Sequence, residues 1–417
     1  MQIRELTNDQ FRQFTSVYPM SSIYQTIEYA LVMSHQDYQS LLLGYIDDAN
    51  NLIAASLVLI ERLNGFKYAY APRGFLIDYQ NEELVKNFTI ALKQYLGKKD
   101  VIAIKISPMI PRNIYDEKTK MLYQNNQYDK IYETLRKYGY FHMGYNLYFE
   151  AHKPRFEAVI DINKPYYQIF QHLKKQVRTK IRSAAKKGVQ IYKGNESNLE
   201  YLYLQAKDKY PRDLKYYQDC FEYMKKKNMV EFFYAKVNTE HYLKTVKQQY
   251  EYYEAKVWQI NQLIQKADEN KKSHLLNKKM KLDLEFANCQ KNLVSATNLL
   301  AEFPDGLITA SIMVSLHKDE VRILADGYDN RFKYFHSKNF LIWQLAERYS
   351  KLGYKKFNLG GMTAMNVKDN PYQGLNQFKL SFNPQVYEYM GDLELITNRM
   401  LYRLYRNMSP IRNILKK

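Results

Sequence analysis

The order of apolar and polar positions predicts two α/β regions with a long helical segment inside the second. Up to about residue 150, strand-like runs ("LLLGYID", "LIAASLVLIERL", "VIAIKISP") accompany a helical pattern over 81–97. A second region begins near "RFEAVIDIN" and continues through "VRILADGYD", a helical pattern over 335–352 and "KKFNLGG". We predict an α/β (α+β) fold with two or more units, because 417 residues exceed what one hydrophobic core usually supports.

The two regions share an internal spacing. In each, a glycine turn is followed by a helix and then a strand, and the separation from Gly74 to Ile106 equals that from Gly327 to Leu359. This agreement indicates a duplicated fold.

Between 240 and 302 the apolar residues follow a heptad pattern with alternating spacings of three and four. The first seam is Leu243, Val246, Tyr250, Tyr253, Val257, Ile260 and Ile264, and the second is Leu275, Leu282, Phe286, Cys289, Leu293, Ala296 and Leu300. The polar stretch "ADENKKSH" separates them, so we predict an antiparallel helical hairpin with arms roughly 30 to 40 Å long at about 1.5 Å per residue. It is either a solvated structural arm or an arm that binds a partner.

The segment "IFQHLKKQVRTKIRSAAKKG" predicts one amphipathic helix that ends at Gly188. Its apolar stripe is Phe170, Leu173, Val177, Ile181 and Ala184, and its cations are Lys174, Lys175, Arg178, Lys180, Arg182, Lys186 and Lys187. With no acidic residue among them these cations repel one another, which favours an anionic partner over a merely solvated face.

Two shorter stretches could form binding sites. In "YPRDLKYY", Pro211 suits the first turn of a helix, and Arg212 and Tyr216 would share one face, an arrangement that suits a diphosphate. In "LNQFKLSFNP", alternation predicts a strand with Phe378, Leu380 and Phe382 on one face and Lys379 with Ser381 on the other. The polar face would meet either solvent or a substrate.

Composition narrows the function. Lys and Arg number 62 against 43 Asp and Glu, a net charge of +19 that favours nucleic acid, anionic lipid or a phosphorylated substrate. Cys220 and Cys289 are too few for a disulfide framework or a cysteine-based metal site, and the sequence contains no phosphate-binding glycine loop, zinc-protease motif or nucleophile elbow. We therefore expect no metal and no cofactor. The opening "MQIRELTNDQFRQF" lacks the apolar core of a signal peptide, which predicts a cytoplasmic protein.

The last residues, 396–417, predict a basic amphipathic tail interrupted at Pro410. Arg403, Arg406, Arg412, Lys416 and Lys417 are interleaved with Leu401, Leu404, Ile411, Ile414 and Leu415. The tail is either a solvated helix or a peripheral contact with the anionic inner face of the cell membrane.

Taken in order, several motifs resemble the Fem family of peptidoglycan bridge-forming aminoacyltransferases over nearly the whole chain. They are "YQTIEYALVM", "YAPRGFLIDY", "VRTKIRSAAKKGVQI", "PRDLKYY", the hairpin, "GYKKFNLGGM" and "NQFKLSFNPQVYEYMGDL". The resemblance implies two tandem GNAT-like subdomains with the coiled-coil arm inserted in the second. The implied boundaries are 1–153 for the first subdomain, 154–239 with 303–395 for the second, 240–302 for the arm and 396–417 for the tail.

The resemblance also implies an activity: transfer of an amino acid from aminoacyl-tRNA to the stem-peptide amine or growing bridge of lipid II or UDP-MurNAc-pentapeptide. A homo-oligomer, or a hetero-oligomer with related family members, is a further implied partner. By motif, Lys379 and Phe378 lie beside the reacting ester, and Arg212, Tyr216, Arg73 and Tyr70 bind substrate. The implied tRNA- or anion-binding residues are Lys174, Lys175, Arg178, Arg182 and Lys186.

Some positions depart from the family pattern. Met33 stands where the family leads us to expect lysine, Ser107 stands before Pro108 in place of aspartate, and an aromatic pair is replaced by Ile323 and Leu324. The alternative function is therefore a member that binds tRNA or cell-wall precursor in a regulatory or scaffolding role without transfer. A general nucleic-acid-binding protein is disfavoured, since no RNA-binding motif is present.

For transfer, the ester is already activated, so the enzyme must align an amine with it and stabilise the oxyanion. We expect the Lys379 ammonium to do the latter. No histidine is placed by motif to act as base, so the proton would pass to substrate or water.

Overall fold

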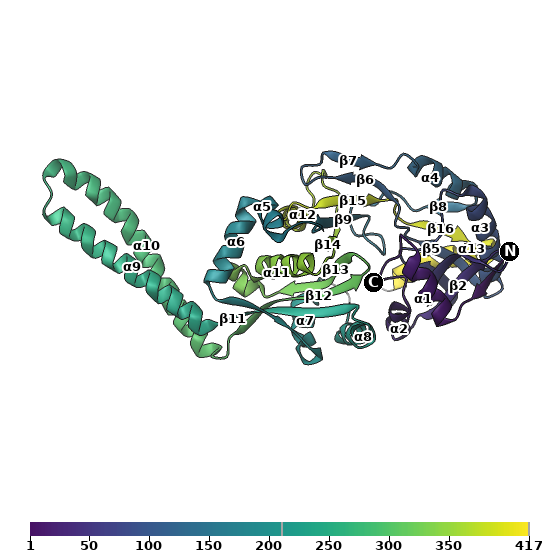
Figure 1. The fold of residues 1–417 in the computed structure, drawn as a ribbon, viewed down its shortest axis with the longest axis horizontal. Helices are drawn as coiled ribbons and strands as arrows, with labels where there is room; N and C mark the ends of the chain where they lie inside the picture. Colours follow the sequence, from purple (N-terminus) through teal and green to yellow (C-terminus); the bar gives the residue numbers. More distant parts are fainter. Residues whose placement is uncertain (210–211, 416–417) are drawn as a thin grey trace.

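The computed structural model describes residues 1–209 and 212–415, the side chains of 408–415 excepted. Two mixed β-sheets lie side by side in the body, and a long helical arm projects from the second (Figure 1). The predicted fold class, a mixed α/β protein with a duplicated unit and an inserted helical hairpin, is confirmed.

The first sheet has seven strands in the order β1-β2-β3-β4-β5-β16-β8. Their bounds are Gln2–Glu5, Gln39–Ile46, Leu52–Leu63, Phe66–Ala71, Val101–Ile106, Leu393–Ile396 and Tyr140–His142. Its helices are α1 (Asn8–Val17), α2 (Ile27–Ser34), α3 (Glu82–Gly97) and α4 (Tyr128–Lys137). α3 shows why the local sequence folds this way: the Asn81 side chain caps its N-terminus, and Val85, Phe88, Leu92 and Leu96 form the buried stripe.

The second sheet has nine strands in the order β10-β11-β12-β13-β14-β9-β15-β6-β7. Their bounds are Val189–Lys193, Val230–Val237, Leu307–His317, Glu320–Tyr328, Lys356–Met362, Phe156–Asp161, Gln385–Tyr389, Pro111–Tyr115 and Met121–Gln124. The accompanying helices are α5 (Tyr166–His172), α6 (Lys175–Lys186), α7 (Leu199–Ala206), α8 (Leu214–Lys225), α11 (Ser337–Lys351) and α12 (Gln373–Leu380).

The duplication is visible in the strand pairing. β2, β3 and β4 are antiparallel neighbours, and α3 then leads to β5, which pairs with β4 in parallel. β11, β12 and β13 repeat this order, and α11 leads to the parallel partner β14. The sheets also exchange strands along the chain, because β6 and β7 lie in the second sheet and β16 lies in the first. The division into subdomains at residue 153 stays a prediction.

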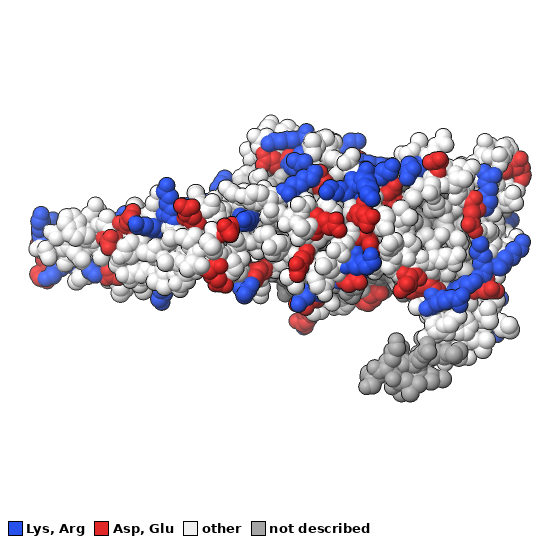
Figure 2. Space-filling view, turned by 90° about the horizontal axis from the view of Figure 1, so that it is seen from below, with Lys and Arg blue, Asp and Glu red and all other residues white. Residues whose placement is uncertain are grey.

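The arm consists of α9 (Thr239–Gln265) and α10 (Glu269–Glu302). The predicted turn is shorter than expected, because the Asp268 side chain accepts a hydrogen bond from the backbone N–H of Lys271 and starts α10 at once. With 34 residues, α10 is about 50 Å long, more than the sequence estimate. Seen from below, residues of both charges are interspersed along the arm and over the body, with uncharged surface between them (Figure 2).

Three local predictions are wrong. The stretch containing Lys379 is the helix α12, in which Phe378 packs edge-on against Phe382 four residues later, at 5.4 Å between ring centroids. In "FKLSF" the apolar residues are spaced by two, as in a strand, while the two phenylalanines are spaced by four, as in a helix. The pattern therefore could not distinguish a strand from a helix. The predicted single basic helix is divided into α5 and α6 at Leu173 and Lys174, where the Lys174 N–H donates to the Ser381 carbonyl.

The third concerns the tail, where α13 (Arg399–Leu415) continues past Pro410. Its Leu401, Tyr402 and Tyr405 pack on Tyr68, Ile102 and Ala103 of the first sheet. Pro211, predicted to begin a helix, lies outside the described residues. Among the described residues, no helix is both long and apolar enough to cross a membrane.

Candidate active site

Lys379 lies where α12 meets a bulge in β14. The pairing of β14 with β9 shifts register between Asn358 and Gly361, and Gly360 adopts a φ of +80° there, which favours glycine. The bulge presents the Gly361 carbonyl oxygen to Lys379, whose Nζ donates to it at 2.6 Å. An ammonium has three donors, so two remain for a ligand.

Two more lysines stand close to Lys379 and share one carboxylate. Asp326, at the end of β13, forms ion pairs with Lys209, which follows α7, and with Lys338, in the first turn of α11. Burial alone would raise the pKa of Asp326, but these two lysines hold it well below its usual range. Burial, opposed by Asp326 and reinforced by the two lysines, lowers the pKa of Lys379 to about 7. Three cations thus surround a single carboxylate.

Phe378 connects this cluster to the predicted reaction centre. The Nζ of Lys338 lies 4.7 Å from the centroid of the Phe378 ring. The structure therefore places Lys379, Phe378 and Lys338 together, as an aromatic and cationic surface beside the bulge.

Arg73, predicted to bind substrate, is buried in a separate charge cluster around Glu157 of β9. Arg322 of β13 forms a bidentate pair with Glu157 at 2.7 and 2.8 Å, and Arg73 donates to the same carboxylate at 2.6 Å. Burial would raise the pKa of Glu157, but Arg322 and Arg73 lower it instead. Asn358 also donates to Glu157, so this carboxylate is saturated.

Tyr70, also predicted to bind substrate, lies at the end of β4. Its hydroxyl lies 3.0 Å from the Oγ of Ser107, and Ser107 donates to Asp392 at 2.7 Å. Ser107 occupies the position where the family pattern suggested aspartate, so Asp392, from the distant "GD" motif, places a carboxylate beside it. Burial and Asp392 raise the pKa of Tyr70 well above its ordinary value.

Arg212 and Tyr216 are brought together as predicted. The guanidinium carbon of Arg212 lies 4.6 Å from the centroid of the Tyr216 ring. α8 itself begins at Leu214, and the Asp213 side chain caps it by accepting from the Tyr216 N–H. No carboxylate among the described residues forms an ion pair with Arg212.

Three of the positions that depart from the family pattern, Met33, Ile323 and Leu324, contribute to the hydrophobic core. Met33 and Ile323 are buried in hydrophobic clusters, and Leu324 packs against one. Met33 therefore serves the core between α2 and α8.

The basic helix α6 runs from the neighbourhood of Lys379 toward the arm. Its N-terminal end is fixed to α12 by the contact between Lys174 and Ser381, and its C-terminal end reaches a cavity at the root of α9 and α10. Lys174, Lys175, Lys180, Arg182 and Lys186 are exposed, and Arg178 is half-buried. These cations and Lys187 all lie in the described part of the chain, and none of them forms an ion pair there.

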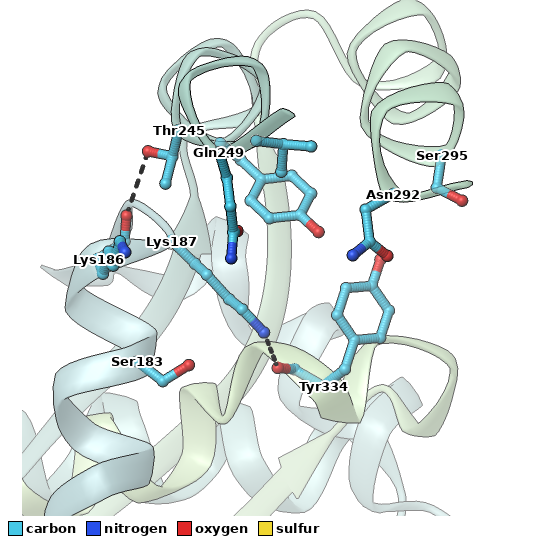
Figure 3. A pocket seen from close by; sticks show the side chains of 10 residues that line it. Ser183, Lys186, Lys187, Thr245, Gln249, Asn292, Ser295 and Tyr334 are labelled. Atoms are coloured by element: carbon cyan, nitrogen blue, oxygen red, sulfur yellow. Dashed lines mark hydrogen bonds between the residues drawn. The ribbon is translucent and has the colours of Figure 1, made fainter. Parts of the chain in front are cut away.

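The arm-root cavity has a volume of about 490 Å³ and no acidic residue in its lining. It is lined by Ser183, Lys186, Lys187, Tyr242, Thr245, Val246, Gln249, Asn292, Ser295 and Tyr334. The amides of Gln249 and Asn292 point into it, and Lys187 crosses its floor to donate to the Tyr334 carbonyl at 2.7 Å (Figure 3). Burial lowers the pKa of Lys187. Such a lining suits a phosphate-bearing, hydrogen-bonding ligand.

Sequence reasoning missed Lys338, Asp326, Glu157 and Lys153. Asp326 lies directly before Gly327, which the duplication had already singled out, so its place at a strand end was the one available signal. Glu157 and Lys153 gave no signal, because their neighbours come from distant parts of the chain. No cluster of potential metal ligands is found among the described residues.

Comparison with known proteins agrees with this arrangement. The profile of the FemAB family matches residues 6–409. Aminoacyltransferase FemA of Staphylococcus aureus (strain MRSA252) is 24% identical over 422 residues, covering 99% of both chains, and FemA of strain N315 gives the same values. The crystal structure of FemX superposes with a TM-score of 0.73 at 18% identity, covering 97% of this chain and 99% of that one, and so supports the fold. Because the family profile spans nearly its whole length, the chain belongs to the FemAB family, as the sequence motifs predicted.

Proposed function

We propose that the protein is a tRNA-dependent aminoacyltransferase that adds an amino acid to the stem-peptide amine or growing interpeptide bridge of a peptidoglycan precursor. The observation that carries this proposal is the position of Lys379. Its ammonium makes one hydrogen bond among the described residues, and the end of its helix contacts the start of α6, whose cations have no carboxylate partner among those residues. Family membership and the likeness to FemA support it.

In the proposed reaction, the neutral amine of the acceptor attacks the ester carbonyl carbon of aminoacyl-tRNA. A C–N bond forms, the carbonyl oxygen becomes an oxyanion, and the ester C–O bond then breaks. The amine proton passes, through substrate or water, to the departing ribose oxygen. Lys379 would donate hydrogen bonds to the oxyanion, and the developing negative charge would favour its protonated form.

The tRNA would lie along α6. Twelve residues make this helix about 18 Å long, enough to follow several phosphates of an RNA strand. A donor with its ester at Lys379 would pass the exposed cations and place a backbone phosphate in the arm-root cavity. This path accounts for the unpaired charges of α6 and for a cavity without acids.

The acceptor would approach from the side of Arg212 and Tyr216. An arginine that rests on an aromatic ring without a carboxylate partner is available for a phosphate or carboxylate of the precursor. Arg73 and Tyr70 would act behind this surface, since both are buried and hydrogen-bonded to protein groups.

Binding without transfer is the alternative, and Met33 favours it. Transfer is favoured by Lys379 and by the Ser107–Asp392 pair, which keeps a carboxylate at the atypical position.

The deciding experiment incubates the purified protein with a panel of aminoacyl-tRNAs charged with labelled amino acids and with lipid II or UDP-MurNAc-pentapeptide. Transfer of label to either acceptor supports the proposal and identifies the donor. Binding of tRNA or precursor without label transfer for every pair would support the regulatory alternative.

Contact with an anionic membrane and oligomerisation with related proteins remain predictions. Part of the tail's apolar face is already used against the first sheet, so a membrane contact would depend mainly on exposed cations such as Arg403 and Arg406.

A further inference from the structure

Lys153 carries an amino group for which the described residues provide no counter-ion. It lies in the segment that leads into β9, and its Nζ is 3.3 Å from the centroid of the Tyr24 ring and 5.6 Å from that of Tyr29. Those two rings meet edge to face at 5.1 Å. No carboxylate of the described residues lies within ion-pair distance of Lys153, and no hydrogen-bond acceptor within the described chain is in contact with it.

The charged groups around Lys153 are mostly of the same sign. They are Arg73 after β4, Glu157 of β9, Arg322 of β13 and Arg212 before α8, and the other titratable groups that interact with Lys153 are Tyr24 before α2, Tyr29 of α2, His152 and Cys220 of α8. The carboxylate of Glu157 also acts on Lys153, and it is already saturated by Arg73 and Arg322. The site therefore has an excess of positive charge.

We propose that Lys153 is a binding residue for the diphosphate of the acceptor substrate, which supplies the counter-ion that the protein withholds. The inference rests on the proposed function, since it deepens the acceptor side of the same site. Arg212 and Lys153 are each supported on tyrosine rings, and the charge of Arg212 acts on Lys153. A diphosphate carries two negative charges, so it matches these two cations better than a single carboxylate would.

This arrangement has a consequence for protons. Burial, together with Arg73, Arg322 and Arg212, lowers the pKa of Lys153 well below its ordinary value. A bound diphosphate would reverse the balance and favour the ammonium. Binding of the acceptor should therefore take up a proton.

Isothermal titration calorimetry tests this directly. UDP-MurNAc-pentapeptide or inorganic pyrophosphate is titrated at one pH into the protein, which is dissolved in buffers of different ionisation enthalpy. The dependence of the binding enthalpy on the buffer gives the number of protons taken up. We expect wild-type protein to bind with proton uptake. Lys153→Met should bind at least tenfold more weakly with no uptake, and Arg212→Ala should bind more weakly but keep the uptake.

A conservative variant separates charge from structure. Lys153→Arg keeps a permanent cation, so it should retain most of the affinity and lose the proton uptake. Equal melting temperatures of the variants exclude a folding defect. Unchanged affinity and uptake in Lys153→Met would overturn the proposal, as would binding of neither probe by the wild type.

Two further ligands identify the source of the anion. Lipid II in detergent should give the same uptake if the diphosphate is the ligand. A stem peptide without diphosphate that gave full uptake would overturn the diphosphate assignment. Label transfer is measured separately. If the wild type transfers label and Lys153→Met binds the acceptor as tightly as the wild type, this inference alone is refuted. If the wild type binds the diphosphate but transfers no label, the enzymatic function alone is refuted.

Discussion

Two buried charge clusters of the second sheet are built on opposite principles. Around Glu157, two arginines and an asparagine saturate one carboxylate, and every partner is a protein group. Around Asp326, two lysines share one carboxylate, and a third lysine, Lys379, donates to a backbone carbonyl and forms no ion pair among the described residues. In the first cluster protein side chains saturate the carboxylate, whereas in the second Lys379 makes one hydrogen bond among the described residues. Charge balance, more than burial, therefore separates a structural cluster from one that fits a substrate.

Glu157→Gln should have the largest effect on stability. The substitution leaves Arg73 and Arg322 buried without their carboxylate, and breaking a buried pair in this way costs about 3 to 5 kcal/mol of unfolding free energy. Denaturant unfolding measures the loss, with the exposed Glu200→Gln as the matched control.

The pH dependence sharpens this prediction. Because the pKa of Glu157 is lower in the folded protein than its ordinary 4.5, its stabilisation is fully present above pH 4.5 and is lost progressively as the pH falls from there toward the folded-state pKa. The difference between wild type and Glu157→Gln should narrow below about pH 4.5. A loss of under 1 kcal/mol at neutral pH would contradict the structural assignment.

Arg212→Ala should affect binding and leave folding intact, the reverse of Glu157→Gln. Arg212 has no carboxylate partner among the described residues, so its removal strands no buried charge. A lost charge-assisted contact should weaken acceptor binding by roughly 1.5 to 3 kcal/mol. Calorimetry with UDP-MurNAc-pentapeptide gives the dissociation constant, and an unchanged value would count against the proposed acceptor side.

The double variant Arg182→Gln with Lys186→Gln tests whether the exposed cations of α6 bind tRNA, as cations without a carboxylate partner among the described residues would. Each lost phosphate contact should lower the slope of log affinity against log salt by about 0.7 to 0.9, with a modest weakening of tRNA binding. Filter binding of uncharged tRNA over a salt series measures the slope. Lys86→Gln on α3 combined with Lys98→Gln directly after it, two exposed lysines, is the control with the same loss of two positive charges. Equal slopes for both variants would remove α6 from the tRNA path.

The smallest expected effect is a shift of the pH profile. If the Lys379 ammonium is required, the single-turnover rate should fall as the pH rises through the pKa of Lys379, about 7. Asp326 raises that pKa and Lys338 lowers it, so Asp326→Asn should move the falling limb to lower pH and Lys338→Met to higher pH. A falling limb that neither Asp326→Asn nor Lys338→Met moved would contradict its assignment to Lys379.

Long periodic patterns made most of the fold predictable. The arm followed from its heptads, α3 and α11 from their amphipathic runs, and the duplication from two equal spacings. "FKLSF" misled because its apolar spacing fits both a strand and a helix. The exchange of β6, β7 and β16 between sheets could not be predicted, since nothing in those short strands specifies a distant partner.

The site was predictable only where residues lie close in sequence. Arg212 with Tyr216 and Lys379 with Phe378 could be identified as pairs from local motifs. Glu157 meets Arg73 and Arg322 across separations of 84 and 165 residues, so its role as their counter-ion required the fold. The same holds for Lys153, whose lack of an ion-pair partner in the described part of the chain is a property of the assembled structure.

The most direct test of the account is single-turnover transfer by Lys379→Met, with Lys86→Met as the matched control. We predict a rate about a hundredfold below wild type, the scale of losing one oxyanion donor, with a melting temperature close to that of the wild type. A transfer rate of Lys379→Met equal to that of the wild type, at an unchanged melting temperature, would contradict the claim that the Lys379 ammonium is catalytic.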